Sequence, residues 1–332
     1  MTTLRAELAE ILRCPACRGP LDGQGLGAHC RPCGRSFPSQ RGVLRFVDAS
    51  TYADSFAFQW NQYPKTQLDD VTLHRSEETL RQKTGFTPDE VGGKLVLDVG
   101  CGMGRFAEVV THWGARVVGV DLSAAAEVAA HNLAGRDFVA VQADVFALPF
   151  APESFDYIYS IGVLHHTPDC EKAFRQLPQY LKPGGSLAIW VYSNHNRWYR
   201  FSDQYRKITH RLHPRTLHRV VRSAVPVVHS VKETLLAVPW VGRSLAGALQ
   251  YVFPISQDSD PEMKILDTFD WYSPQYQSKH SFAEVTRWFE ECGLESVESL
   301  PVPVAVRGRN PKQLLVQDES PNEQMVGTDP KL

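Results

Sequence analysis

The alternation of apolar and polar positions is clearest between residues 94 and 193, where short apolar runs are followed by turns and helical patterns. In Val96–Phe106 an apolar run ends in an acid, glycines follow at alternate positions, and a helical pattern then begins. This pattern predicts a strand, a tight turn and the N-terminus of a helix. A second apolar run ends at Asp121. A carboxylate in that place can accept two hydrogen bonds from ribose hydroxyls.

The glycines of the first turn are Gly100, Gly102 and Gly104. Glycine lets a backbone approach a ligand closely and adopt angles that other residues avoid. Their G-x-G-x-G spacing, preceded by Asp98, differs from the G-x-G-x-x-G fingerprint of dinucleotide sites. A nicotinamide-dependent reductase is therefore not expected.

Four further blocks follow the glycine turn in order: Gln142–Val145, Leu148–Ser160, Gly162–Thr167 and Leu181–Tyr192. Together with the turn they resemble the class I S-adenosylmethionine-dependent methyltransferases, nearest to the C-methylases of quinone and deoxysugar biosynthesis. The resemblance implies an α/β fold with a Rossmann-like, seven-stranded sheet and an antiparallel closing strand. The cofactor contacts it implies are Asp98, Gly100, Gly102, Gly104, Asp121, Leu122, Asp144, Val145 and Ser160. Pro178 departs from the pattern, and we expect it to break the helix there.

The resemblance divides the chain into a core and additions. The segments expected are a zinc ribbon (1–50), a linker or lid (51–93), the cofactor-binding core (94–193), a helical cap that carries the substrate insertion (194–280), a helix and closing hairpin (281–310), and a polar, disordered tail (311–332). In the C-terminal part, Ser281 and Glu284 form a predicted capping box and Gly293 a predicted helix stop.

The ribbon is predicted from the spacing C-x2-C-x12-C-x2-C of Cys14, Cys17, Cys30 and Cys33. Such pairs of cysteines are typical of a metal site. Four thiolates favour zinc, with rubredoxin-like iron as the alternative. The segment resembles the small ribbon that accompanies some RNA and sugar methyltransferases. With four protein ligands no coordination position stays open, so we interpret the metal as structural.

Composition limits the classes of partner. The 332 residues carry a formal net charge of −2, so the chain as a whole has no polycationic signature for nucleic acid. The N-terminal pattern does not predict a signal peptide, and no stretch approaches the roughly 20 apolar residues of a spanning helix. A cytoplasmic location is therefore expected, with reduced cysteines.

Substrate contacts are predicted from the linker and from the cap. Basic residues, namely Lys207, Arg211, Arg215, Arg219 and Arg222, recur every three or four positions and would share one helical face that restarts at Pro214. This face could grip an anionic substrate, lie on a membrane surface and admit a quinone-like substrate, bind RNA, or simply face solvent. The candidate substrate contacts are Gln59, Trp60, Tyr63, Tyr192, His195, Trp271 and Tyr276.

The expected chemistry is methyl transfer to an O, N or C atom of a small-molecule acceptor. His165 and His166 follow the fourth strand of the core, and an imidazole there could act as general base, with His165 the first candidate. Two alternatives remain open: an rRNA or tRNA base methyltransferase, and a cofactor-binding cyclase that transfers no methyl group.

Overall fold

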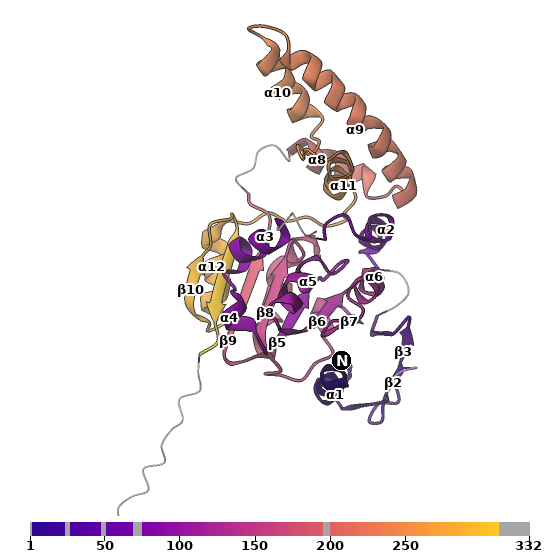
Figure 1. Cartoon of the computed structure of the whole chain (residues 1–332), viewed down its shortest axis with the longest axis vertical. Helices are drawn as coiled ribbons and strands as arrows, with labels where there is room; N and C mark the ends of the chain where they lie inside the picture. The colour runs from indigo at the N-terminus through magenta and orange to yellow at the C-terminus, as the bar shows by residue number, and fades with distance from the viewer. Residues whose placement is uncertain (1, 24–26, 48–50, 69–74, 195–199, 312–332) are drawn as a thin grey trace, which may run out of the picture.

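The computed structural model describes residues 2–23, 27–47, 51–68, 75–194 and 200–311. Its centre is a sheet whose core strands run in the order β7-β6-β5-β8-β9-β11-β10 (Figure 1). The first five pair in parallel, and β11 is antiparallel to both of its neighbours. The predicted seven-stranded core with an antiparallel closing strand is therefore confirmed. The strands are β5 (Leu95–Val99), β6 (Arg116–Asp121), β7 (Phe138–Gln142), β8 (Phe155–Ile161), β9 (Leu181–Trp190), β10 (Glu295–Ser299) and β11 (Ala305–Arg309).

Helices cover both faces of this sheet, because its central strands are apolar throughout; every residue of β5 is buried. One face packs against α1 (Thr2–Ile11), α7 (Cys170–Arg175) and α12 (Phe282–Glu291). The other packs against α3 (Arg75–Thr84), α4 (Pro88–Val91), α5 (Arg105–His112) and α6 (Ala125–Asn132). The two layers leave the carboxyl ends of the parallel strands as the edge where a ligand can bind.

The residues predicted to start or end helices in the core do so in the structure. Pro178 ends the helical stretch after α7 and begins the 3-10 turn η3 (Pro178–Tyr180). Ser281 and Glu284 form the capping box of α12, and Gly293 leaves the helix with φ of +74°. Two more 3-10 turns, η1 (Val145–Ala147) and η2 (Leu164–His166), follow strands β7 and β8 at the ligand-binding edge.

The N-terminal ribbon is joined to the core more closely than its sequence suggests. Its strands are β1 (Leu21–Asp22), β2 (Gly27–Cys30), β3 (Ser36–Gln40) and β4 (Val43–Arg45). Strand β4 pairs in parallel with β7, with Leu44 opposite Val141, so the ribbon extends the sheet to eleven strands. The guanidinium of Arg18 also donates to the carbonyls of Leu148 and Phe150, each at 2.8 Å.

The cap consists of α8 (Arg200–Thr209), α9 (Pro214–Leu236), α10 (Gly242–Val252) and α11 (Pro261–Tyr272). Helices α9 and α10 form a hairpin that projects away from the sheet (Figure 1). Pro214 starts α9 as predicted. The single basic face predicted from Lys207 to Arg222 is wrong, because α8 ends at Thr209 and the chain turns before α9 begins.

Helix α2 (Asp54–Gln62) forms the first part of the predicted linker and lies between the core and the cap (Figure 1). The Tyr63 hydroxyl after it hydrogen-bonds with Nε2 of His218 on α9 at 2.8 Å. Across the described residues, no helix combines the length and the apolarity needed to cross a bilayer. The predicted disorder of 312–332 and the candidate His195 fall outside the described residues.

Candidate functional site

The glycine turn after β5 places bare backbone against the ligand-binding edge. Gly100 and Gly102 have φ of +83° and +52°, a region that favours glycine. A Cβ atom at Gly100 would collide with the side chain of Val163. One at Gly102 would lie 3.1 Å from the indole nitrogen of Trp60. Glycine is therefore required at these two positions because φ is positive and because a Cβ atom would have too little room, as the sequence predicts.

Asp121, at the end of β6, is fixed by this turn. One carboxylate oxygen accepts from the backbone N–H of Gly102 at 2.9 Å. The other accepts from the N–H and the hydroxyl of Ser123, at 2.8 and 2.7 Å. Burial raises the pKa of Asp121, while these three hydrogen bonds lower it. The carboxylate is thus held rigidly beside the turn, where it can accept further hydrogen bonds from a ligand.

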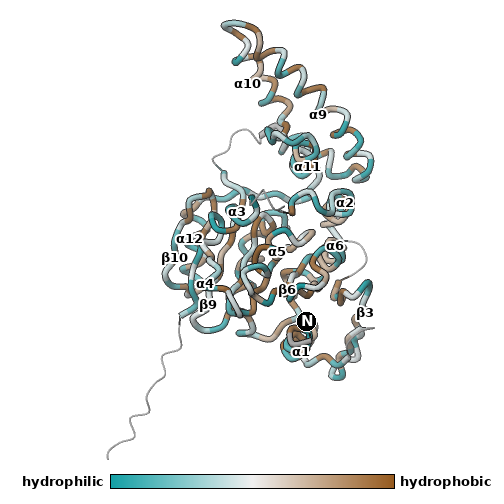
Figure 2. The backbone as a smooth tube through the Cα atoms, in the orientation of Figure 1, coloured by the Kyte–Doolittle hydropathy of each residue, from teal (hydrophilic) through white to brown (hydrophobic). Residues whose placement is uncertain are grey.

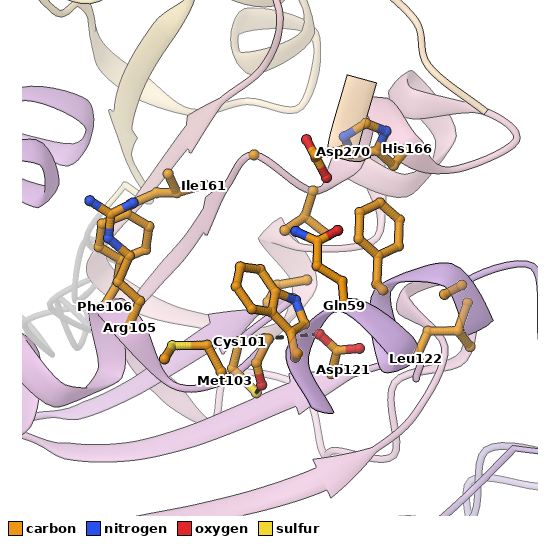
Figure 3. A pocket seen from close by; sticks show the side chains of 18 of the residues that line it. Gln59, Cys101, Met103, Arg105, Phe106, Asp121, Leu122, Ile161, His166 and Asp270 are labelled. Carbon is orange, nitrogen blue, oxygen red and sulfur yellow. Dashed lines mark hydrogen bonds between the residues drawn. The ribbon is translucent and has the colours of Figure 1, made fainter. Parts of the chain in front are cut away.

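A cavity of about 470 Å³ is lined by residues at the carboxyl ends of the core strands and by residues of α2 and α11. Figure 3 shows Gln59, Asp121 and Asp270 around it. Its inner wall combines the glycine turn with apolar side chains, which suits a nucleoside and its methionine-derived chain. The predicted cofactor residues on this wall are Gly100, Gly102, Asp121, Leu122 and Val145. The residues present therefore fit S-adenosylmethionine.

Four predicted cofactor residues support the wall and do not line it. Asp98 is buried, and desolvation raises its pKa to about 7, with Asp121 adding to the shift. The hydroxyl of Ser160 donates to the Val99 carbonyl at 2.9 Å. Gly104 is the N-cap of α5, and Asp144 accepts from the N–H of Phe146 as the N-cap of η1. Their positions stabilise the strand ends, and direct cofactor contacts by them remain predictions.

The outer part of the cavity is lined by most of the predicted substrate residues. Gln59, Trp60, Tyr192 and Trp271 all face it. Tyr63 does not, because its hydroxyl is engaged with His218. Tyr276 contributes its carbonyl, which accepts from the N–H at Nδ1 of His166 at 3.0 Å, but it too is absent from the wall.

The two histidines have different positions. His166 lines the cavity, and burial lowers its pKa to about 4. Its hydrogen bond to a carbonyl means that Nδ1 carries the proton. His165 is fully buried, stacks on Tyr192 with ring centroids 3.9 Å apart, and does not line the cavity. Burial holds its pKa well below the usual range. This placement does not support the prediction of His165 as the first candidate base.

Two carboxylates from the cap face the same cavity. Asp267 and Asp270 lie one turn apart on α11. Burial raises the pKa of each to about 6, and Asp270 adds to the rise at Asp267. The Tyr192 hydroxyl donates to Asp270 at 3.2 Å and opposes its shift. A carboxylate whose pKa lies near neutrality can take up a proton during turnover.

Two cationic side chains that the sequence analysis missed line the cavity near the glycine turn. Arg105 directly follows that turn, which is the one local signal that could have identified it. Lys83 comes from α3, and its ammonium lies 3.3 Å from the centre of the Trp190 ring. Burial, together with Arg105, lowers the pKa of Lys83 to about 7. No motif marks Lys83, because its position depends on how α3 packs.

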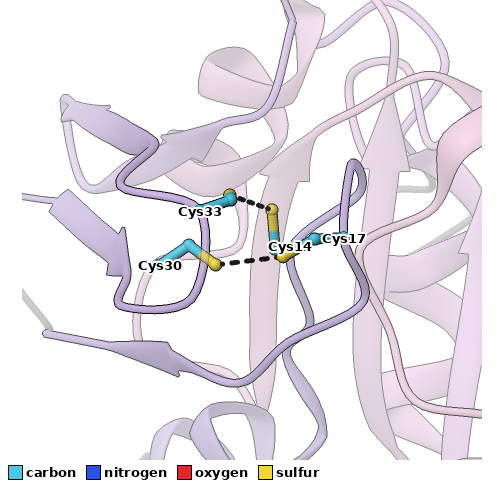
Figure 4. Close-up of side chains that lie close together, drawn as sticks. All are labelled: Cys14, Cys17, Cys30 and Cys33. Atoms are coloured by element: carbon cyan, nitrogen blue, oxygen red, sulfur yellow. Dashed lines mark hydrogen bonds between the residues drawn. The ribbon is translucent and has the colours of Figure 1, made fainter.

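The four ribbon cysteines converge on one point (Figure 4). All four sulfur atoms lie within 4.8 Å of one another. Cys14 and Cys33 are 3.6 Å apart, and Cys17 and Cys30 are 3.3 Å apart. Four thiolates around a tetrahedral zinc ion, with Zn–S of about 2.3 Å, have sulfur atoms about 3.8 Å apart. The donor set and its spacing therefore fit a structural zinc ion.

Comparison with known proteins identifies two segments. Residues 97–189 match the family model described as a methyltransferase domain, and residues 5–42 match the one described as Trm112p-like protein. The sterol 24-C-methyltransferase of Kluyveromyces lactis is 24% identical over 257 residues, which are 75% of this chain and 63% of that protein. The protein of Mus musculus named probable tRNA methyltransferase 9B is 34% identical over 122 residues, 36% of this chain and 26% of the relative.

A solved S-adenosylmethionine-dependent methyltransferase from Mesorhizobium loti is 30% identical, with a TM-score of 0.33 over 39% of this chain and 57% of that one. The chain spans less than two thirds of the length of the relatives named here. The family matches agree with the glycine turn, the sheet order and the cysteine cluster described above. The chain therefore contains a methyltransferase domain of the class I S-adenosylmethionine-dependent family, preceded by a Trm112p-like segment.

Proposed function

We propose that this protein transfers a methyl group from S-adenosylmethionine to an O, N or C atom of a small-molecule acceptor. The proposal rests on the position of Asp270 on cap helix α11. Its side chain lines the same cavity as the glycine turn. The cavity is roofed by α2 and α11, and its outer wall is aromatic, which suits a compact, partly apolar acceptor.

The cofactor would lie on the glycine turn, with its ribose hydroxyls on Asp121 and its adenine between Leu122 and Val145. When bound, it supplies an electrophilic methyl group that is displaced in line from a sulfonium. Arg105 places positive charge beside the turn, where it can pair with the carboxylate of the methionine end, and Lys83 adds to this charge when it is protonated. Trp60, packed on Gly102, excludes water from this part of the site.

Asp270 is the proposed general base for an acceptor that reacts through O–H or N–H. Its carboxylate would take up the proton that the acceptor loses on methylation. Tyr192 holds the carboxylate in place, and His166 stays neutral because its pKa is about 4. A neutral imidazole with its proton on Nδ1 can orient the acceptor through Nε2.

A tRNA base methyltransferase is the second candidate. It is favoured by the Trm112p-like segment and by the identity shared with the mouse relative. The net charge of −2 argues against a large polyanionic substrate.

The proposal is tested by incubating the protein with methyl-labelled S-adenosylmethionine and a metabolite extract from which nucleic acid has been removed. Label in a low-molecular-mass product, lost in Asp270→Asn, supports it. Label that appears only when total tRNA is added supports the second candidate. A filter-binding titration then checks the assignment, because RNA affinity falls steeply with salt. Retention of the methyl group by the cofactor during turnover would indicate the cyclase alternative.

We also propose that the four cysteines hold one zinc ion per chain. Elemental analysis of freshly purified, reduced protein tests this directly. A result without zinc or iron would refute it.

A further inference from the structure

The turn that joins α9 to α10 is an apolar tip whose residues are all exposed. It comprises Ala237–Val241 and is flanked by Leu236 and Leu245. Trp240 is fully exposed, and Val238 and Val241 are about half-exposed. Figure 2 shows hydrophobic positions along both helices of the hairpin, at the end farthest from the sheet. Soluble surfaces seldom display large apolar side chains in one contiguous group.

The second half of α9 contributes no buried residue to a core. The buried residues of α9, namely Leu217, His218, Val221 and Val225, all lie in its first half, where they meet α11 and α2. Between residues 226 and 241, no residue is buried. The first half therefore anchors the hairpin on the cap, and the second half extends an apolar surface beyond what folding of the described chain requires.

The tip is built as a tight and defined turn. Gly242 starts α10 so close to the carbonyl of Leu235 that a Cβ atom would collide with it. Trp240 adopts a left-handed backbone conformation with φ of 67°. That conformation is unfavourable for a large side chain, and residues held in it are concentrated at functional positions. The turn thus displays the indole outward at a conformational cost.

The hairpin is also strongly basic. Between residues 214 and 257, Glu233 is the one acidic residue, against Arg215, Arg219, Arg222, Lys232 and Arg243. Arg243 lies directly beside the tip. Lys232, on the last part of α9, donates to the side chain of Gln257, which follows α10. This charge contrasts with the chain as a whole, whose net charge is −2. It matches a negatively charged surface and would repel a second copy of the same hairpin.

We propose that the α9–α10 hairpin docks its tip in the headgroup region of an anionic lipid bilayer. Trp240, Val238 and Val241 enter the interface, and Arg243 pairs with lipid phosphates. Tryptophan is the side chain most typical of this region, and basic residues add electrostatic attraction to anionic lipid. The apolar tip is short, so it would enter only the interfacial layer of the bilayer. The inference stands apart from the proposed activity.

The test is co-sedimentation of the full chain with vesicles of phosphatidylcholine containing about one third phosphatidylglycerol, and with vesicles of phosphatidylcholine alone. We expect binding to the anionic vesicles, weakened by salt. Trp240→Ser and Val238→Asp should each lower the partition coefficient about tenfold or more, because each removes apolar burial. Ile208→Ser is the matched control, since Ile208 is exposed on α8, away from the tip, and its binding should equal that of the wild type.

Two outcomes would overturn the proposal. One is equal sedimentation of the wild type and both tip variants, with thermal unfolding showing that all are folded. The other is light scattering that finds a wild-type dimer without lipid and a monomer for Val238→Asp, which would make the tip a self-association surface. A blue shift of tryptophan emission on vesicle addition, absent in Trp240→Phe, would provide independent support.

Discussion

The hydroxyl of Tyr192 donates a hydrogen bond of 3.2 Å to the carboxylate of Asp270, joining the segment after β9 to cap helix α11. Through this contact a residue that follows the core sheet holds a cap residue over the glycine turn. The acceptor side of the cavity is thus held together by a hydrogen bond between the core and the cap.

Asp270→Asn should lower turnover by about 10²–10⁴-fold for an acceptor that must lose a proton. The pKa of Asp270 is about 6, so its carboxylate is protonated below that pH. Wild-type turnover should therefore rise with pH through about 6 and then level off. Initial rates across this range, with the affinity for S-adenosylmethionine measured alongside, provide the test. A variant that keeps the same rising limb would exclude Asp270 as the base.

Removal of the Asp270 carboxylate should also change how the free energy of unfolding depends on pH. Its pKa is raised from the usual value near 4, so the unfolded state releases the proton more readily and the native state loses stability as pH rises from about 4 to 6. Asp270→Asn should remove this pH-dependent loss. Thermal unfolding at pH 5 and pH 8 measures it. A steeper loss of stability in the variant would contradict the assigned shift.

Asp121→Ala should weaken cofactor binding strongly. It removes charge-assisted hydrogen bonds worth roughly 1.5–3 kcal/mol each and also releases the N–H of Gly102. Calorimetry with S-adenosylhomocysteine measures the change. Asp169→Ala serves as a control for general effects, because Asp169 caps α7 and does not line the cavity. Unchanged affinity of Asp121→Ala would refute the placement of the ribose.

His165→Ala should reduce the free energy of unfolding by about 2–4 kcal/mol, because it leaves a void beneath Tyr192. Turnover per folded molecule should change little, since His165 does not reach the cavity. Urea denaturation and rate measurements on the same samples separate the two effects. A large loss of turnover with wild-type stability would restore His165 as a catalytic candidate.

Removal of the ribbon metal should destabilise the core as well as the ribbon. Strand β4 pairs with β7, and Arg18 donates to the carbonyls of Leu148 and Phe150, so loss of the ribbon exposes one edge of the main sheet. Thermal unfolding with and without a strong chelator, followed by zinc addition, tests this. Cys33→Ser should reproduce the effect. An unaltered unfolding temperature would mean that the cysteines need no metal.

The sequence alone determined the features that depend on neighbouring residues. The glycine turn between Val99 and Arg105 follows from backbone angles that only glycine adopts readily. Pro178 breaks its helix because it lacks an amide hydrogen, and the spacing of Cys14 and Cys17 points both thiolates toward one site. These signals are local, so they could be interpreted without knowledge of the packing.

Only the tertiary structure decided which side chains meet in the cavity. His165 and His166 are adjacent in sequence, yet one is buried against Tyr192 and the other faces the cavity. Lys83 and Asp270 come from helices far apart in the sequence and line the same cavity. Such placements depend on how the cap and α3 pack on the sheet. The packing energy is the total of many weak contacts between residues that are far apart in the sequence. The pattern of residues within a short segment therefore does not predict it.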